Sequence, residues 1–158
     1  MSKPLDVLLI TPPSRVQVYQ ELSRDFAAIE PPVWSGLIAT FLRQHSCSVA
    51  ILDAEAEGLN HQQTADRIAA IAPRLAVFVI YGQQPSASTQ CMPAGRKVCE
   101  ILTALADIPT LVMGTHPSAL PKRTLLEEPY TYVCQGEGPA TILGLVIALR
   151  APQHSLRE

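Results

Sequence analysis

The length, composition and charge of this chain exclude several classes of protein. With 158 residues, 47% hydrophobic and 5% aromatic side chains, it fits one domain with one aliphatic core. Twelve basic and fourteen acidic residues, without a block of like charge, argue against a nucleic-acid partner. No apolar run is long enough to span a membrane, and proline breaks the N-terminus too early for a signal peptide. We therefore expect a cytoplasmic protein with no membrane partner.

Five short apolar runs alternate with helical patterns along the chain. The predicted strands are Asp6–Thr11, Ser48–Asp53, Leu75–Tyr81, Thr110–Met113 and Thr131–Gln135. The predicted helices are Val33–His45, Asn60 or His61 to Ala72, Ser86 or Ser88 to Ala106, Pro121–Glu128 and Pro139–Arg150. Near-continuous apolar strands suit a sheet that is covered on both faces. The pattern predicts an α/β fold, a Rossmann-like (flavodoxin-like) doubly wound five-stranded parallel sheet in three layers, with strand order 2-1-3-4-5.

Two segments fall outside this regular alternation. The connection Pro12–Pro32 is long, and long connections are often functional. Within it, Tyr19, Leu22 and Phe26 lie three and four residues apart, which predicts one face of a short helix that acts as a lid. We expect the domain to occupy residues 1–150, and the polar residues 151–158 to begin a linker or tail.

The four cysteines lack the spacing of a metal site. They stand at positions 47, 91, 99 and 134, too far apart for a zinc knuckle or an iron–sulfur motif. The sequence therefore predicts no metal ligands, and it predicts reduced thiols, of which Cys47 and Cys134 fall inside apolar strand patterns.

Polar and glycine-rich segments follow every predicted strand. Because the carboxyl ends of parallel strands meet at one edge of the sheet, these segments predict a broad ligand-binding rim. Each segment also has a plainer interpretation: a strand stop, a solvated turn, a helix N-cap at Ser86 or Ser88, an exposed loop histidine, or a turn at two glycines. The candidate binding residues are Thr11, Pro12, Pro13, Asp53, Ala54, Glu55, Gly58, Tyr81, Gly82, Ser86, Ser88, Gly114, Thr115, His116, Gly136, Glu137 and Gly138.

Several common ligands of such folds are disfavoured by the residues present. A dinucleotide needs GxGxxG after the first strand, where this chain has Thr11-Pro12-Pro13, and no P-loop motif exists. A receiver domain needs an aspartate at the end of the third strand, which here ends in Tyr81-Gly82. A flavodoxin needs free N–H donors in a phosphate loop that the two prolines cannot supply. No convincing nucleophile–base pair stands out, so we assign no catalytic residue and expect no catalysis from this chain alone.

The order of the motifs resembles one family, the cobalamin (B12)-binding domain at the N-terminus of B12-dependent radical SAM enzymes. The matching stretches cover nearly the whole chain. They are VLLITPP at 7–13, AIEPPVWSGLIATFLR at 28–43, AILDAEAEG at 50–58, MGTHPSALP at 113–121 and CQGEGPATI at 134–142. The resemblance implies a corrinoid bound along the carboxyl edge of the sheet by the candidate residues named above.

The resemblance also makes an expectation about the cobalt. The wider superfamily supplies a cobalt-ligating histidine from a DxHxxG motif, and here Glu55 stands where that histidine would be in Asp53–Gly58. This departure implies base-off cobalamin without a histidine ligand from that loop.

The same family carries out its chemistry, such as methyl transfer, in a barrel domain with an iron–sulfur cluster and S-adenosylmethionine. This chain has no CxxxCxxC motif, so those cofactors belong to a domain outside it, which is the partner that the resemblance implies. The alternative is a flavodoxin-like regulatory or protein-interaction domain without a cofactor.

Overall fold

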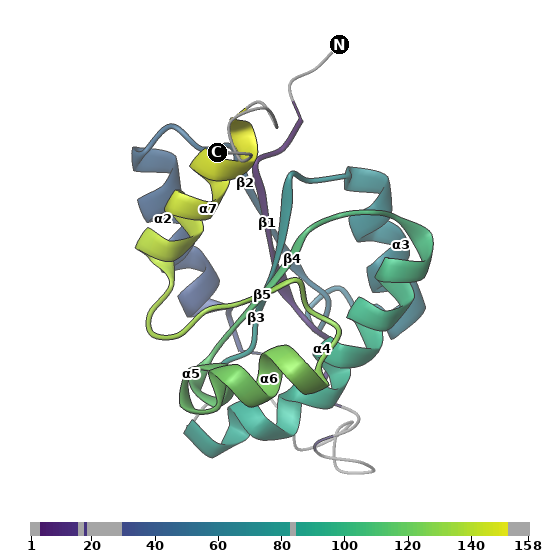
Figure 1. Cartoon of the computed structure of the whole chain (residues 1–158). Helices are drawn as coiled ribbons and strands as arrows, with labels where there is room; N and C mark the ends of the chain where they lie inside the picture. Colours follow the sequence, from purple (N-terminus) through teal and green to yellow (C-terminus); the bar gives the residue numbers. More distant parts are fainter. Residues whose placement is uncertain (1–3, 16–17, 19–29, 83–84, 152–158) are drawn as a thin grey trace.

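A computed structural model describes residues 4–15, 18, 30–82 and 85–151 of the chain (Figure 1). Five parallel strands form one sheet in the order β2-β1-β3-β4-β5, which confirms the predicted topology. Their bounds are β1 Val7–Thr11, β2 Val49–Asp53, β3 Leu75–Val79, β4 Thr110–Met113 and β5 Tyr132–Val133. The strand β5 is the shortest: it has two residues, both paired with β4, whereas the sequence predicted a strand of five residues there.

The helices also follow the predicted order, with one addition. Their bounds are α2 Val33–Gln44, α3 His61–Ile71, α4 Pro85–Leu105, α5 Thr115–Ala119, α6 Pro121–Glu127 and α7 Pro139–Arg150. The short helix α5 lies in a segment that the sequence analysis treated as a loop. The sequence pattern does not predict this helix, which begins Thr115-His116-Pro117, because five residues are too few to form a periodic apolar face.

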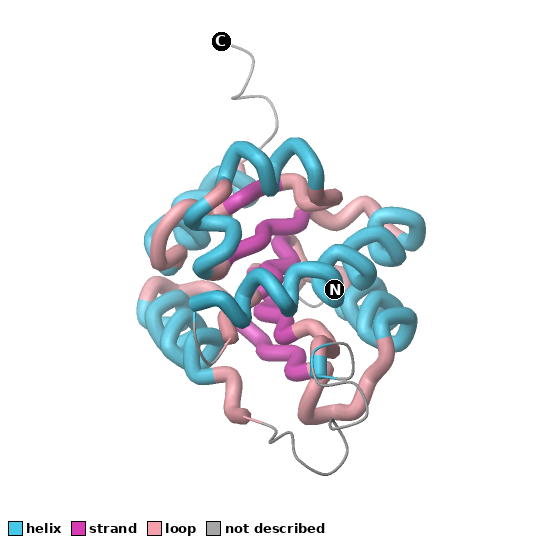
Figure 2. Tube along the Cα trace, turned by 90° about the horizontal axis from the view of Figure 1, so that it is seen from below, coloured by secondary structure: helices cyan, strands magenta, loops and turns pink. Residues whose placement is uncertain are grey.

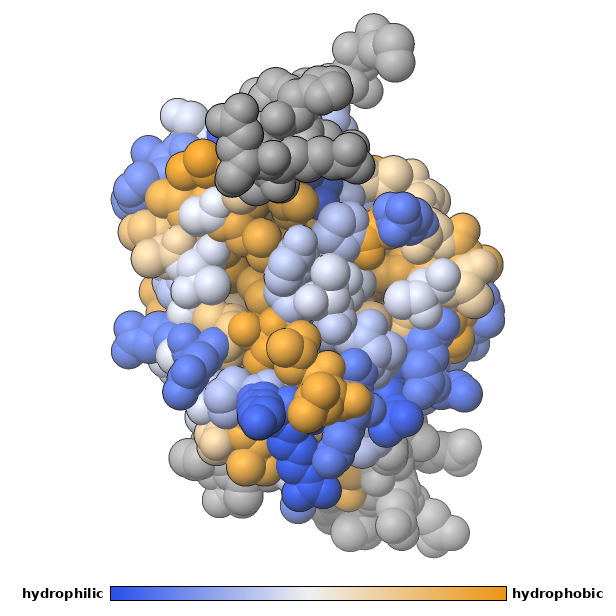
Figure 3. Space-filling view, in the orientation of Figure 1, coloured by the Kyte–Doolittle hydropathy of each residue, from blue (hydrophilic) through white to orange (hydrophobic). Residues whose placement is uncertain are grey.

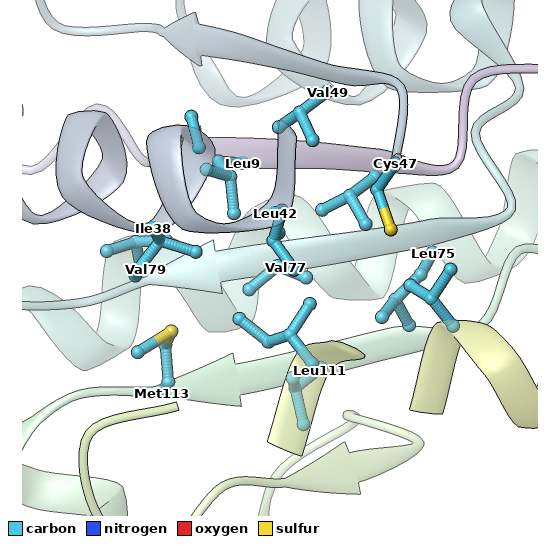
Figure 4. Close-up of a cluster of buried hydrophobic side chains, with 14 of the residues drawn as sticks. Leu9, Ile38, Leu42, Cys47, Val49, Leu75, Val77, Val79, Leu111 and Met113 are labelled. Atoms are coloured by element: carbon cyan, nitrogen blue, oxygen red, sulfur yellow. The ribbon is translucent and has the colours of Figure 1, made fainter. Parts of the chain in front are cut away.

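Helices cover both faces of the sheet and bury two apolar clusters. On one face, α2 and α7 pack on the sheet through Ile38, Leu42, Ile142 and Val146 (Figure 4 shows the α2 side). On the other face, α3 and α4 enclose a second cluster around Phe78. Figure 2, viewed along the strands, shows the sheet between these two helical layers. The three-layer α/β prediction is therefore confirmed.

A buried carboxylate ties the amino edge of the sheet to the last helix. Asp6, just before β1, is 0% exposed and receives hydrogen bonds from Arg150 Nη2 (2.7 Å) and Nε (3.0 Å) at the end of α7. The Ser48 hydroxyl donates to the same carboxylate at 2.7 Å, and Arg74 Nε lies 3.6 Å from it. Despite burial, the hydrogen bonds from Arg150 and Ser48 hold the pKa of Asp6 well below its ordinary value.

Two earlier expectations concern segments that lie outside the described residues. They are the lid carrying Tyr19, Leu22 and Phe26, and the tail over residues 152–158. Among the helices described, none has both the length and the apolar character needed to cross a membrane.

Candidate functional site

The carboxyl ends of all five strands meet at the lower edge of the molecule as drawn in Figure 1. The predicted binding residues lie in the segments that follow these ends, so the parallel topology gathers them along one edge. We call these predicted residues, together with the residues found to contact them in the following paragraphs, the carboxyl rim. The side chain of one predicted member, Ser86 in the first turn of α4, is outside the described residues.

At the β1–β2 corner, a tight turn holds the acidic loop against the end of β1. Thr11 and Asp53 are paired across the two strands, and the Thr11 carbonyl accepts the Ala54 N–H at 3.1 Å. Asp53 Oδ1 accepts the Ala56 N–H at 3.2 Å, and Gly58 adopts a φ of +63° that favours glycine. The Asp53 side chain is therefore largely used to build the loop, and Ala54 is fully buried inside it.

Glu55 is held by Arg15, which reaches it from the loop after β1. One carboxylate oxygen, Oε1, accepts a hydrogen bond from the Arg15 backbone N–H. The other, Oε2, lies 3.8 Å from the Arg15 Nε, and both side chains are mostly shielded from solvent. Burial raises the pKa of the Cys91 thiol, on α4; an interaction with Ser14 opposes this rise, and the nearby negative charge of Glu55 adds to it. The residue in the superfamily's histidine position thus carries a carboxylate that is already engaged.

On the other side of β1, an aromatic pair marks the rim. The rings of Trp34, at the start of α2, and Tyr81, after β3, stack with centroids 4.8 Å apart at 21°. Trp34 remains 45% exposed. Partial burial, reinforced by the negative charge of Glu137 after β5, raises the pKa of Tyr81. The pair therefore offers an apolar ring surface with a neutral hydroxyl beside it.

Two of the predicted glycines, Gly82 and Gly114, are required by packing within the protein. A Cβ at Gly82 would lie 2.1 Å from that of Ala87, and a Cβ at Gly114 would lie 2.0 Å from the Ile80 carbonyl oxygen. At Gly138 a Cβ would meet the end of the flexible Met113 side chain, 2.4 Å away, and the φ of +92° is what favours glycine at this position. The sequence analysis counts Gly114 among the binding residues, whereas the structure fills the space beside its Cα with the backbone of Ile80. Gly136 differs, because its Cβ position meets nothing within 4 Å.

Ser88 is not a helix cap, which was one interpretation of its position. It lies inside α4, fully buried, and its hydroxyl donates to the Ile80 carbonyl. The Ser88 hydroxyl oxygen also accepts the backbone N–H of His116 at 3.1 Å. The His116 ring nitrogen Nδ1 lies 3.0 Å from Thr89 Oγ1. Ser88 thus joins the end of β3 to the start of α5, and α4 positions His116.

The loop after β5 is attached to α5 through Ser118. The Gly136 N–H donates to Ser118 Oγ at 3.0 Å, and this hydroxyl donates to the Gly136 carbonyl at 3.3 Å. Glu137, the next residue, is exposed, so its carboxylate faces solvent at the rim. These contacts bring the segments after β4 and β5 together, as the sequence predicted from topology.

Four rim residues were not identified from the sequence: Arg15, Trp34, Thr89 and Ser118. Trp34 carried a signal, because it is the one tryptophan of the chain and directly follows a Pro-Pro-Val helix start. The other three are ordinary polar residues, whose contacts depend on segments far apart in the chain.

The described residues contain no group of three or more His, Cys, Asp or Glu side chains able to hold a metal ion. All four cysteines are free, and all but Cys91 are buried, close to the prediction. A surface hollow of about 430 Å³ lies over α5 and α6 and contains none of the predicted residues. Figure 3 shows apolar and charged side chains mixed over the lower part of the face drawn there. Leu126, which lines the hollow, is 75% exposed.

Comparison with solved structures identifies similar folds. The radical S-adenosylmethionine methyltransferase TsrM from Kitasatospora setae, solved with cobalamin and a [4Fe-4S] cluster, gives a TM-score of 0.68 at 15% identity, over 92% of this chain and 24% of that chain. The cobalamin-dependent S-adenosylmethionine radical enzyme OxsB, with aqua-cobalamin and S-adenosylmethionine bound, gives 0.66 at 16% identity, over 93% and 19%. This chain therefore spans a quarter or less of the length of these proteins.

Sequence comparison identifies the family directly. A comparison with curated proteins found no match. The B12 binding domain profile, by contrast, matches residues 22–146, most of the chain and every predicted strand after the first. The resemblance drawn from the motifs is thereby confirmed, and the chain belongs to the B12 binding domain family.

Proposed function

We propose that this chain binds cobalamin along the carboxyl rim and serves a radical SAM reaction, such as methyl transfer, carried out by a domain outside it. The observation that carries the proposal is the family match over residues 22–146, on a sheet whose carboxyl edge gathers the predicted polar segments. When bound, cobalamin would supply the cobalt chemistry, and the protein would hold and orient it.

The donor set at the rim suits this cofactor. Cobalamin is large, rich in amides and nearly neutral apart from one phosphate, so it calls for hydroxyls, backbone groups and ring surfaces rather than a cluster of charge. The rim offers these through the Trp34–Tyr81 stack, His116, Ser118 and the open space beside Gly136. We propose that these residues, with the predicted set, contact the corrin side chains and the nucleotide tail.

The proposal extends to the coordination of cobalt. Glu55 replaces the histidine of the DxHxxG motif, and its carboxylate is held by Arg15. We therefore propose that cobalamin binds base-off, without a protein nitrogen ligand from the Asp53–Gly58 loop.

Titration of the purified chain with hydroxocobalamin tests the binding proposal. We expect saturable changes in the visible corrin bands. A His116→Ala variant at the rim should bind more weakly, and an Asp107→Ala variant, an exposed residue before β4 at the opposite edge, should bind like the wild type. Unchanged bands with protein that is folded by circular dichroism would contradict the proposal and favour the regulatory or interaction domain.

A further inference from the structure

Two residues in the first turns of α4 hold His116 at two different atoms. Ser88 accepts its backbone N–H, and Thr89 Oγ1 lies 3.0 Å from its ring nitrogen Nδ1. Ser88 is itself fixed, because it is buried and donates to the Ile80 carbonyl. The described hydrogen bonds therefore place the backbone and the Nδ1 edge of the His116 ring, and none of them engages Nε2. The Glu128 carboxylate lies near enough to interact electrostatically with this ring.

The hydrogen bond at Nδ1 decides what Nε2 can do. In a neutral imidazole one nitrogen carries the hydrogen and the other is an acceptor, and the partner of one nitrogen selects the role of the other. When a hydroxyl donates to Nδ1, the hydrogen of the ring must stand on Nε2. Nε2–H is then a donor, which suits an amide carbonyl or a phosphate oxygen.

We propose that the Thr89 hydroxyl donates to His116 Nδ1, which makes Thr89 a positioning residue: it keeps His116 in the Nε2–H tautomer and so presents a hydrogen-bond donor to an acceptor oxygen of the bound ligand. Only the identity of that ligand, cobalamin, rests on the proposed function. Thr89 need not touch the ligand, because its effect passes through the imidazole.

Nitrogen NMR of histidine-labelled protein tests the tautomer directly. A second histidine provides an internal reference: His45 Nδ1 lies 2.9 Å from the Phe41 carbonyl oxygen, which can only accept, so this ring must carry its hydrogen on Nδ1. We expect two-bond nitrogen–proton correlations of opposite pattern for His45 and His116, with the His116 signals assigned by their loss in His116→Gln.

Two substitutions at Thr89 separate positioning from a merely structural role. Thr89→Ser keeps the hydroxyl and should keep the Nε2–H pattern, whereas Thr89→Val keeps the shape and should give a mixture of tautomers. Thr89 is exposed, so neither change disturbs the core. A wild-type His116 with its hydrogen on Nδ1, or a His116 pattern unchanged in Thr89→Val, would overturn the proposal.

Hydroxocobalamin titration adds the consequence for binding. We expect the Kd of Thr89→Val to rise about twofold, because only the fraction of rings that carry the hydrogen on Nε2 can donate to the ligand, and that of Thr89→Ser to stay near the wild-type value. Equal affinities of the wild type and Thr89→Val would overturn the ligand-facing role. If the wild type does not bind hydroxocobalamin at all, the proposed function fails, and the tautomer measurement still decides whether Thr89 positions His116.

Discussion

At the scale of single residues, Glu55 is the most informative departure from the superfamily motif. The loop around it has the features that the motif needs: Asp53 caps the turn, and Gly58 takes a positive φ. The side chain at the histidine position is instead a carboxylate that anchors Arg15 and the loop after β1. A carboxylate committed to that contact is a poor candidate for the cobalt ligand, and this is why we propose coordination without a histidine ligand from the Asp53–Gly58 loop.

Restoring the histidine tests this interpretation. In the wild type, electron paramagnetic resonance of bound cob(II)alamin should show no nitrogen superhyperfine splitting. Glu55→His should introduce single-nitrogen splitting, because the loop backbone already has the motif's turn. Labelling the protein's histidines with ¹⁵N should then change the pattern and identify the ligand as a protein nitrogen.

A matched variant controls for the loss of the Arg15 contact. Glu55→Gln keeps an oxygen that can accept the Arg15 N–H, and it should remain without splitting. Nitrogen splitting already present in the wild type would contradict the proposed coordination, and its loss in His116→Ala would point to that ring instead.

At the scale of elements, helices α3 and α4 each contain a local sequence feature, a capping box in α3 and an internal proline in α4. Helix α3 begins with a capping box, in which Asn60 Oδ1 accepts the Gln63 N–H and Gln63 Oε1 accepts the Asn60 N–H, both at 2.9 Å. Helix α4 is continuous although it contains Pro93, which has no N–H for the carbonyl four residues earlier. The turns before this proline carry Ser88 and Thr89, the residues that position His116.

The capping box predicts a measurable loss of stability. Asn60→Ala should lower the free energy of unfolding by about 1 kcal/mol, because it removes the cap of an otherwise mainly polar helix. Asn60→Asp, which can still accept the Gln63 N–H, should stay close to the wild type. Urea denaturation followed by circular dichroism measures both, and equal losses in the two variants would show that the cap does not stabilise α3.

At the scale of the whole molecule, the Asp6 cluster connects residues that are far apart in the sequence. Arg150 lies 144 residues from Asp6 in the sequence, yet its Nε and Nη2 atoms both donate hydrogen bonds to the Asp6 carboxylate. Arg74 and Ser48 bring the starts of β3 and β2 to the same point. The cluster thus fixes the end of α7 against the amino edge, on the side of the sheet opposite to the carboxyl rim.

Removal of the Asp6 charge should destabilise the fold in a pH-dependent way. Asp6→Asn should lower the free energy of unfolding at pH 7 by about 3 kcal/mol, the low end for a buried pair, because the arginines are partly exposed. The folded pKa lies below the ordinary 3.8, so the stabilisation is complete above that value and is lost as the pH falls towards the folded pKa. The difference in stability between the two proteins should therefore begin to shrink below about pH 4 and shrink further as the pH falls.

Urea denaturation at a series of pH values measures this difference. Asp66→Asn, an exposed carboxylate on α3 that contacts Gln62, is the control and should change stability by less than about 0.5 kcal/mol. A difference between Asp6→Asn and the wild type that does not diminish at low pH would mean that packing, rather than charge, explains the loss.

The sequence by itself determined the topology, most element bounds and the edge at which the predicted binding segments meet. It could do so because apolar strands, helix caps and glycine turns are local patterns, and parallel strands must place their carboxyl ends together. The tertiary structure alone decided which polar groups pair: Arg15 with Glu55, Thr89 with His116, and Arg150 with Asp6. These pairs join segments that are distant in the sequence. The structure also shows that Gly114 serves packing, because its neighbour is the backbone at the end of another strand. Such contacts leave no periodic trace in a single sequence, since they depend on three-dimensional proximity rather than on spacing along the chain.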